Sequence, residues 1–271
     1  MYYNTIYRKK LVEKYRNIFK SEKKPEWAVK KLNNPSEVLH PAIPFVGKDY
    51  DKTRLIVYAS AENLSFYKND KDGYLDDDNK AIFRRYNYLN KESYFPQLHC
   101  GPIDCGPLLI VSAYILKYLK YKITYDNAHE FITNIATDNF GKFSKAGNSN
   151  SDYAGNINLL KYSLKYIEAD LQILKPKIII LPYKIYEFKE IQELIASFVP
   201  SCVCIPIYQM MAHNINKKDR ISKYPKRKQE NIDPLILEWH NKISEKNNKF
   251  PINNFYSVYN YLDYIIKKYI K

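Results

Sequence analysis

The sequence predicts an α/β fold of three layers, with helices on both sides of a central, mostly parallel four-stranded sheet. Short apolar, β-favouring runs alternate with longer segments of helical periodicity, and this alternation favours parallel strands joined by helices. One run, residues 178–181, is continuously apolar, as is typical of strands buried on both faces of a sheet. A chain of 271 residues with 45% hydrophobic composition can fill the core of one large domain of this class.

The remaining strands are expected at 54–58, 131–135 and 202–208. The best-defined helix precedes the 178–181 strand and ends before Pro176, because proline disfavours helical backbone at the preceding residue. Further helices are predicted from Gly106–Pro107, where proline suits the first turn, and over roughly 184–198. The best-defined helix has apolar residues at alternating spacings of four and three, which predicts one buried face: Leu160, Leu164, Ile167, Leu171 and Leu174.

The domain organisation follows from changes in composition along the chain. Residues 1–40 are charged, with aromatic residues at helical intervals, so we expect an N-terminal helical extension of one or two helices that covers the core. Residues 40–48 contain two prolines and one glycine and connect this extension to the main domain, 41–271. Three further parts of the main domain are expected: a polar loop at 138–158, a basic loop at 214–231 and an amphipathic C-terminal helix at 255–270.

The charge balance points to a polyanionic partner. Lysine and arginine number 43 and aspartate and glutamate 29, which gives a net charge of +14. An excess of this size favours DNA or RNA over an anionic membrane, the competing interpretation being a solvated, lysine-rich surface. No run of about 18 apolar residues is present, so no membrane span is expected. The charged N-terminus lacks the apolar core of a secretion signal, which makes the cytoplasm the expected compartment.

The four cysteines do not predict a metal site. Cys100, Cys105, Cys202 and Cys204 match no common zinc spacing, and the last two fall within or beside an apolar run, where they are expected to be small core residues. The cysteines therefore give no indication of a bound metal ion.

Polar, chemically useful residues follow three of the apolar runs. Ser60, Glu62 and Asn63 follow the first, Asn134 lies near the end of the second, and His213 follows the last. Ligands of open parallel sheets bind just beyond the carboxyl ends of the strands. These side chains are therefore expected to meet at one edge and to form one active site.

The order of these segments resembles the uracil-DNA glycosylase superfamily over roughly residues 40–215. Residues 55–63 are similar to the strand and water-activating loop of that family, and Tyr94-Phe95-Pro96 to its base-stacking segment. Residues 131–135 resemble its asparagine strand, and Met211 to Asn214 stand where its histidine loop belongs. The helix-to-strand junction at 174–180 is similar to that of the iron–sulfur branch, although the cluster's cysteine pattern is absent.

The first loop departs from the family pattern. Tyr58 or Ala59 stands in place of the usual glycine, and Ser60 and Ala61 stand about where the acid or amide and the proline belong. The nearest carboxylate, Glu62, is shifted by two places and occupies the place of the tyrosine that blocks ring substituents in the uracil-specific branch. This loop therefore leaves room for a modified pyrimidine as well as uracil.

The resemblance implies a monomeric DNA glycosylase, needing no cofactor, that extrudes a nucleotide and hydrolyses its N-glycosidic bond, leaving an abasic site. Glu62, with Ser60, would orient water and stabilise the cation-like sugar, and His213 would donate to the departing base. Asn134 would read the pyrimidine edge, because one amide offers both a donor and an acceptor, with Asn63 completing the pocket. Phe95 would stack on the extruded base.

Basic residues on both sides of this site are expected to bind the DNA phosphates. On one side they lie in the 214–231 loop, and on the other they follow the asparagine strand. The predicted contacts are Lys217, Lys218, Arg220 and Lys223 on the first side, and Lys142 and Lys145 on the second.

Each of these residues also has a purely structural interpretation. Glu62 and Asn63 could cap a helix, Asn134 could bind loop backbone, and Phe95 could belong to the core. At the level of function, the alternatives are excision of bulky modified cytosine from phage DNA as a defence activity, and a catalytically inactive DNA-binding protein. An unrelated α/β hydrolase acting on nucleotides is a weaker alternative, because no glycine-rich phosphate loop is present.

Overall fold

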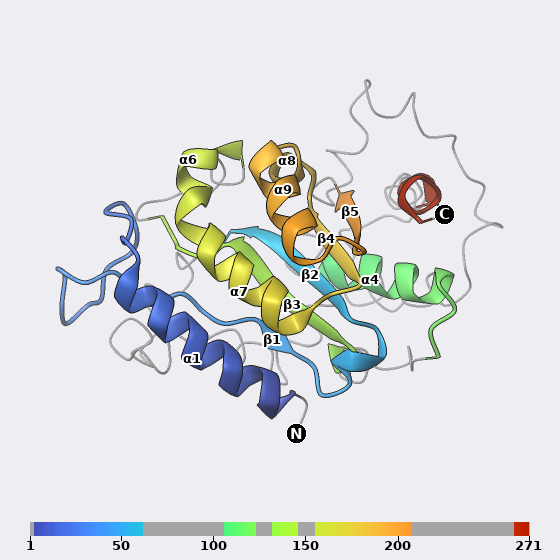
Figure 1. The fold of residues 1–271 in the computed structure, drawn as a ribbon, viewed down its shortest axis with the longest axis horizontal. Coiled ribbons are helices and arrows are strands. Elements are labelled where there is room, and N and C mark those ends of the chain that lie inside the picture. Colours follow the sequence, from blue (N-terminus) through green and yellow to red (C-terminus); the bar gives the residue numbers. More distant parts are fainter. Residues whose placement is uncertain (1–2, 62–105, 123–131, 146–154, 208–262, 271) are drawn as a thin grey trace, which may run out of the picture.

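The computed structural model describes residues 3–61, 106–122, 132–145, 155–207 and 263–270, and these build an α/β fold around one mixed sheet (Figure 1). The sheet has five strands in the order β1-β3-β2-β4-β5, rather than the four expected. The strand β1 pairs antiparallel with β3, and the other pairs are all parallel. The strands are β1 (Phe45–Val46), β2 (Leu55–Ala61), β3 (Ile135–Gly141), β4 (Ile178–Pro182) and β5 (Val203–Ile207).

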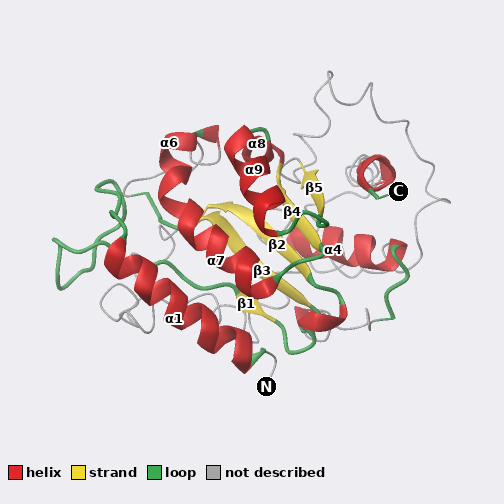
Figure 2. Ribbon diagram, in the orientation of Figure 1, coloured by secondary structure: helices red, strands yellow, loops and turns green. Residues whose placement is uncertain are grey.

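Helices lie on both faces of this sheet (Figure 2). On one face α1 (Thr5–Ser21) packs against α7 (Leu164–Leu174), and α7 packs against α9 (Lys189–Phe198). On the other, α4 (Gly106–Tyr118) packs against β2, and the Tyr114 hydroxyl donates to Asp263 at the start of a helical segment at 263–269. Among the described residues, four short elements complete the connections: the 3₁₀ turns η1 (Tyr50–Lys52) and η5 (Lys161–Ser163), and the helices α6 (Ile157–Leu160) and α8 (Tyr183–Tyr186). Within the described ranges, no helix has the length and apolar character needed to span a bilayer.

Alternation along β2 divides the core between the two faces. Ile56 and Tyr58 belong to one buried cluster with Ile167 and Leu171 of α7 and Tyr15 of α1. Successive side chains of a strand point to opposite faces, so the equally buried Leu55 and Val57 face the α4 side. The continuous apolar run of β2 is therefore explained by burial on both faces.

Most of the expected elements are confirmed. The α4, β4 and β5 segments lie where predicted, and the expected 160–174 helix corresponds to α6, η5 and α7 in succession. It ends at Leu174, where Lys175 caps it in the left-handed conformation (φ 46°) just before Pro176. The covering N-terminal helix is α1, whose Leu11, Tyr15 and Ile18 are buried.

The second strand was predicted in the wrong place. Residues 132–134 form a helical turn, and β3 runs over 135–141, into the stretch expected to be a loop. The strand contains Thr137, Asp138 and Asn139, which conceal its apolar pattern. The Asp138 carboxylate is tolerated because the Lys142 ammonium binds it, and Thr137 and Asn139 lie on the opposite face, as described below.

Three fully buried tyrosines predict a steep loss of stability in alkali. Burial raises the pKa of Tyr15, Tyr50 and Tyr58 well above the usual value of 10.0, and nearby Asp170 adds to this for Tyr15 and Tyr58. The folded state therefore keeps protons that the unfolded chain releases above pH 10, so stability is complete below that pH and falls as pH rises. Above pH 10, each of these tyrosines should lower the free energy of unfolding by about 1.4 kcal/mol per pH unit.

The variant Tyr50→Phe isolates one of these groups, because within the described part of the chain the Tyr50 hydroxyl makes a single, long hydrogen bond, 3.5 Å to the Leu174 carbonyl oxygen. The free energy of unfolding, measured with denaturant from pH 9 to 11.5, should fall less steeply with pH in this variant, by the equivalent of about one proton. An unchanged slope would contradict the assignment.

Candidate functional site

The sheet opens at the carboxyl ends of β2 and β4. These strands pair only as far as Val57 and Ile180. Beyond that point β2 continues along β3 as far as Ala61 and Gly141, whereas β4 continues along β5 as far as Pro182 and Ile207. The connection from β2 runs to a neighbour on one side, β3, and the chain then returns to the other side at β4. Such a topological switch point is where open α/β sheets bind ligands.

Ser60 lies at this edge, as expected. It is half-buried at the carboxyl end of β2, next to Ala61 and beyond the last residue that pairs with β4. The other residues expected beside it, Glu62, Asn63, Phe95 and His213, lie outside the described residues, as do the phosphate contacts predicted for the basic loop: Lys217, Lys218, Arg220 and Lys223.

Asn134 does not belong to this edge. It precedes β3, and its carbonyl oxygen accepts a hydrogen bond from the Thr53 hydroxyl, just before β2 begins. The parallel register pairs Leu55 with Ile135 at this end and Ala61 with Gly141 at the other. Six residue steps at about 3.3 Å separate the two ends by roughly 20 Å. Asn134, which is 6% exposed, therefore lies at the amino edge of the sheet and cannot share a pocket with Ser60.

The amide side chain near the carboxyl edge of the sheet is that of Asn139. It is the register partner of Ala59 on β2, two residues before the end of β3, and is 7% exposed. Asp138 points to the α7 face, so alternation directs Asn139 to the opposite, α4 face. Thr137 lies on that same face, and among the described residues its buried hydroxyl has no hydrogen-bond partner. Two groups able to read a polar ligand thus lie on one face beside the switch point.

Lys142 is a buried structural residue and not a phosphate contact. Its side chain is 1% exposed, and its ammonium group forms ion pairs with Asp138 and, at 2.7 Å, with Asp170 of α7. The backbone N–H of Lys142 donates to the Ser163 hydroxyl at 2.9 Å. A cation enclosed in this way cannot reach DNA, which corrects the role predicted for it.

Two tyrosines complete this buried ionic cluster. The hydroxyl of Tyr15 donates to Asp170 at 2.8 Å and that of Tyr58 donates at 3.2 Å, and the Lys142 ammonium lies 5.3 and 5.7 Å from the centres of their rings. Burial raises the pKa of Asp170 from 3.8 to about 7, and the neighbouring Lys142 opposes that shift. The cluster is sealed from solvent, so it joins the end of β3 to β2, α7 and α1 rather than acting on a substrate.

One signal for this cluster is present in the sequence. Asp170 lies three residues after Ile167 and four before Leu174, on the apolar face of the predicted helix. A carboxylate at such a position needs a buried partner. The sequence does not say which basic residue supplies it, because Lys142 is 28 residues away along the chain.

Lys145 stays close to the carboxyl edge. It is half-buried and forms an isolated antiparallel bridge with Ala28, and the N–H of Val29 donates to the Ser144 carbonyl oxygen at 2.9 Å. The segment after α1 therefore lies beside the end of β3, on the side away from β2.

Within the described part of the chain, no group of three or more His, Cys, Asp and Glu side chains is arranged to hold a metal ion. Comparisons of the chain with protein-family models, with curated proteins and with solved structures find no match.

Proposed function

We propose that this protein is a DNA glycosylase that binds an extruded pyrimidine nucleotide at the switch point between β2 and β4 and hydrolyses its N-glycosidic bond. The observation that carries the proposal is the parting of these two strands beyond Val57 and Ile180, which opens the carboxyl edge beside Ser60. The net charge of +14 supports a polyanionic substrate. The order of segments that resembles the uracil-DNA glycosylase superfamily supports this reaction class.

In this proposal Asn139 takes the base-reading role expected of Asn134. Its amide can donate to one atom of a pyrimidine edge and accept from the next, and Thr137 can add a hydroxyl contact. Support comes from the register, which sets Asn139 beside Ala59 and two residues from the end of β3. The carboxylate remains Glu62, the residue that follows Ala61 in the sequence, since Asp138 is committed to Lys142.

Two alternatives differ in chemistry. Excision of a bulky modified cytosine is favoured by the small side chains of Ala59, Ser60 and Ala61, which leave room at the end of β2. An inactive DNA-binding protein of the same fold is favoured by the departure of these residues from the family's loop.

One experiment separates the three. The full chain is incubated with duplex and single-stranded DNA carrying uracil, unmodified cytosine or a bulky modified cytosine at one position, and abasic sites are then cleaved with alkali. We expect strand breaks at the uracil or the modified cytosine and none at unmodified cytosine. Binding to every substrate without a break on any would overturn the glycosylase proposal in favour of the inactive binder.

A further inference from the structure

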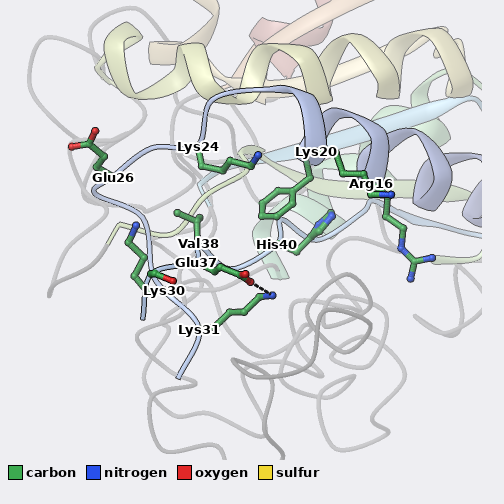
Figure 3. A pocket seen from close by; sticks show the side chains of 11 residues that line it. Arg16, Lys20, Lys24, Glu26, Lys30, Lys31, Glu37, Val38 and His40 are labelled. Atoms are coloured by element: carbon green, nitrogen blue, oxygen red, sulfur yellow. Dashed lines mark hydrogen bonds and ion pairs between the residues drawn. The ribbon is translucent and has the colours of Figure 1, made fainter. Parts of the chain in front are cut away.

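A basic pocket lies at the end of α1, outside the buried ionic cluster. It has a volume of about 740 Å³ and is bounded by the last turns of α1 and by the segment that follows it (Figure 3). Five cationic side chains line it, against two carboxylates, so its walls carry a surplus of three positive charges. The cations are Arg16, Lys20, Lys24, Lys30 and Lys31.

The pocket is partly preorganised. Phe19 and His40 stack at its base with ring centres 4.2 Å apart, and the Lys24 ammonium lies 5.0 Å from the centre of the Phe19 ring. The ammonium of Lys31 is held at 2.7 Å by Glu37. Lys20 and Lys30, in contrast, have no carboxylate partner among the described residues. A pocket with fixed walls and cations left to neutralise suits an anionic ligand.

The position of the pocket identifies the kind of anion. The segment that carries Lys30 and Lys31 is bound to the chain just after β3, through Val29 N–H and Ser144. It therefore lies at the carboxyl edge of the sheet, on the same side of the molecule as the ends of β2 and β3 (Figure 1). DNA bound at the switch point would therefore run past the same side of the molecule as this pocket.

We propose that this pocket binds the phosphodiester backbone of DNA on one side of the nucleotide held at the switch point. The inference rests on the proposed function for the identity of the polymer. The N-terminal segment is then a DNA-binding element and not only a cover for the core. Lys20, Lys24 and Lys30 contact phosphates, and Lys31 is positioned by Glu37.

The test compares two triple variants of the full chain by fluorescence anisotropy of labelled DNA over a range of salt concentrations. The first replaces Lys20, Lys24 and Lys30 with glutamine. The matched control replaces Lys9, Lys10 and Lys14, which are exposed on α1 and do not line the pocket. Both variants lose the same net charge, so any general electrostatic effect is shared.

The pocket variant should bind about tenfold or more weakly at 0.1 M salt, and its plot of log affinity against log salt should be shallower by about two to three. The control should keep a slope within about one of the unmodified chain, and both variants should melt at nearly the same temperature. Shortening the DNA stepwise on each side of the target should remove the difference between the pocket variant and the unmodified chain once the backbone is too short to reach the pocket.

Several outcomes would overturn the proposal. Equal losses in both triple variants would mean that only overall charge matters. If pyrophosphate or ATP displaces labelled DNA from the control variant but has no such effect on the pocket variant, the proposal is supported. If pyrophosphate binds to the pocket without changing the affinity for DNA, the pocket is a site for small anions instead. If the pocket variant binds DNA more weakly but the unmodified chain excises no base, the DNA-binding role of the pocket stands and the glycosylase proposal fails. If the unmodified chain excises a base and the pocket variant binds DNA normally, the glycosylase proposal stands and the role of the pocket fails.

Discussion

Replacing Asn139 with alanine should lower the rate of base excision by about 10² to 10³, while Asn134→Ala should leave it within a few-fold of the unmodified chain. Loss of one hydrogen bond to a departing, negatively charged base has an effect of that size, because the bond is strongest in the transition state. Asn139 is placed beside Ala59 at the carboxyl edge, whereas Asn134 lies at the amino edge. Single-turnover kinetics on the preferred substrate would measure both rates.

The two asparagines form a matched pair. Asn134 directly precedes β3 and Asn139 lies within it, and they are 6% and 7% exposed, so each alanine variant should lose a similar amount of stability, about 1 kcal/mol. Glu62→Gln should reduce excision at least as strongly as Asn139→Ala if Glu62 orients the water. The opposite pattern, with Asn134→Ala inactive and Asn139→Ala active, would contradict the assignment of the base-reading amide.

The contrast between these asparagines also shows what sequence periodicity can locate. The strands β4 and β5 are nearly continuous apolar runs, and the α7 face repeats at helical spacing, so burial alone identifies them. In β3 the sequence Ile-Ala-Thr-Asp-Asn-Phe-Gly has polar residues at its centre. The preceding Phe-Ile-Thr at 131–133 is more apolar, so the sequence predicts a strand several residues too early, with Asn134 near its end, whereas Asn139 lies near the end of the observed strand.

Two other features depend on tertiary contacts that a sequence pattern does not contain. β1 has only two residues, Phe45 and Val46, within a segment rich in proline and glycine, and is recognisable only by its pairing with β3. Lys142 looks like a surface lysine because the carboxylates that neutralise it come from another strand position and another helix. A charge count cannot distinguish a buried lysine from an exposed one.

Replacing Lys142 with methionine should destabilise the fold by about 3–5 kcal/mol, the usual effect of removing one partner from a buried ionic group. The Asp138 and Asp170 carboxylates, 2% and 0% exposed, would then lie close together with no cation between them. Denaturant unfolding at pH 7.5 would measure the loss. Lys161→Met is the control, because Lys161 is exposed on η5 and should change stability by less than about 1 kcal/mol.

The pH dependence distinguishes this explanation from simple loss of packing. Burial raises the pKa of Asp170 to about 7 even with Lys142 present, so folding takes up a proton and stability falls as pH rises from about 4 to about 7. Without Lys142 that uptake should be larger, and Lys142→Met should regain stability on acidification more steeply than the unmodified chain. Adding Asp170→Asn, whose side-chain oxygen can still accept from Tyr15 or Tyr58, should restore much of the lost stability. A deficit that is independent of pH and unaffected by Asp170→Asn would mean that the Lys142 side chain stabilises the fold through its hydrocarbon stem and not through its charge.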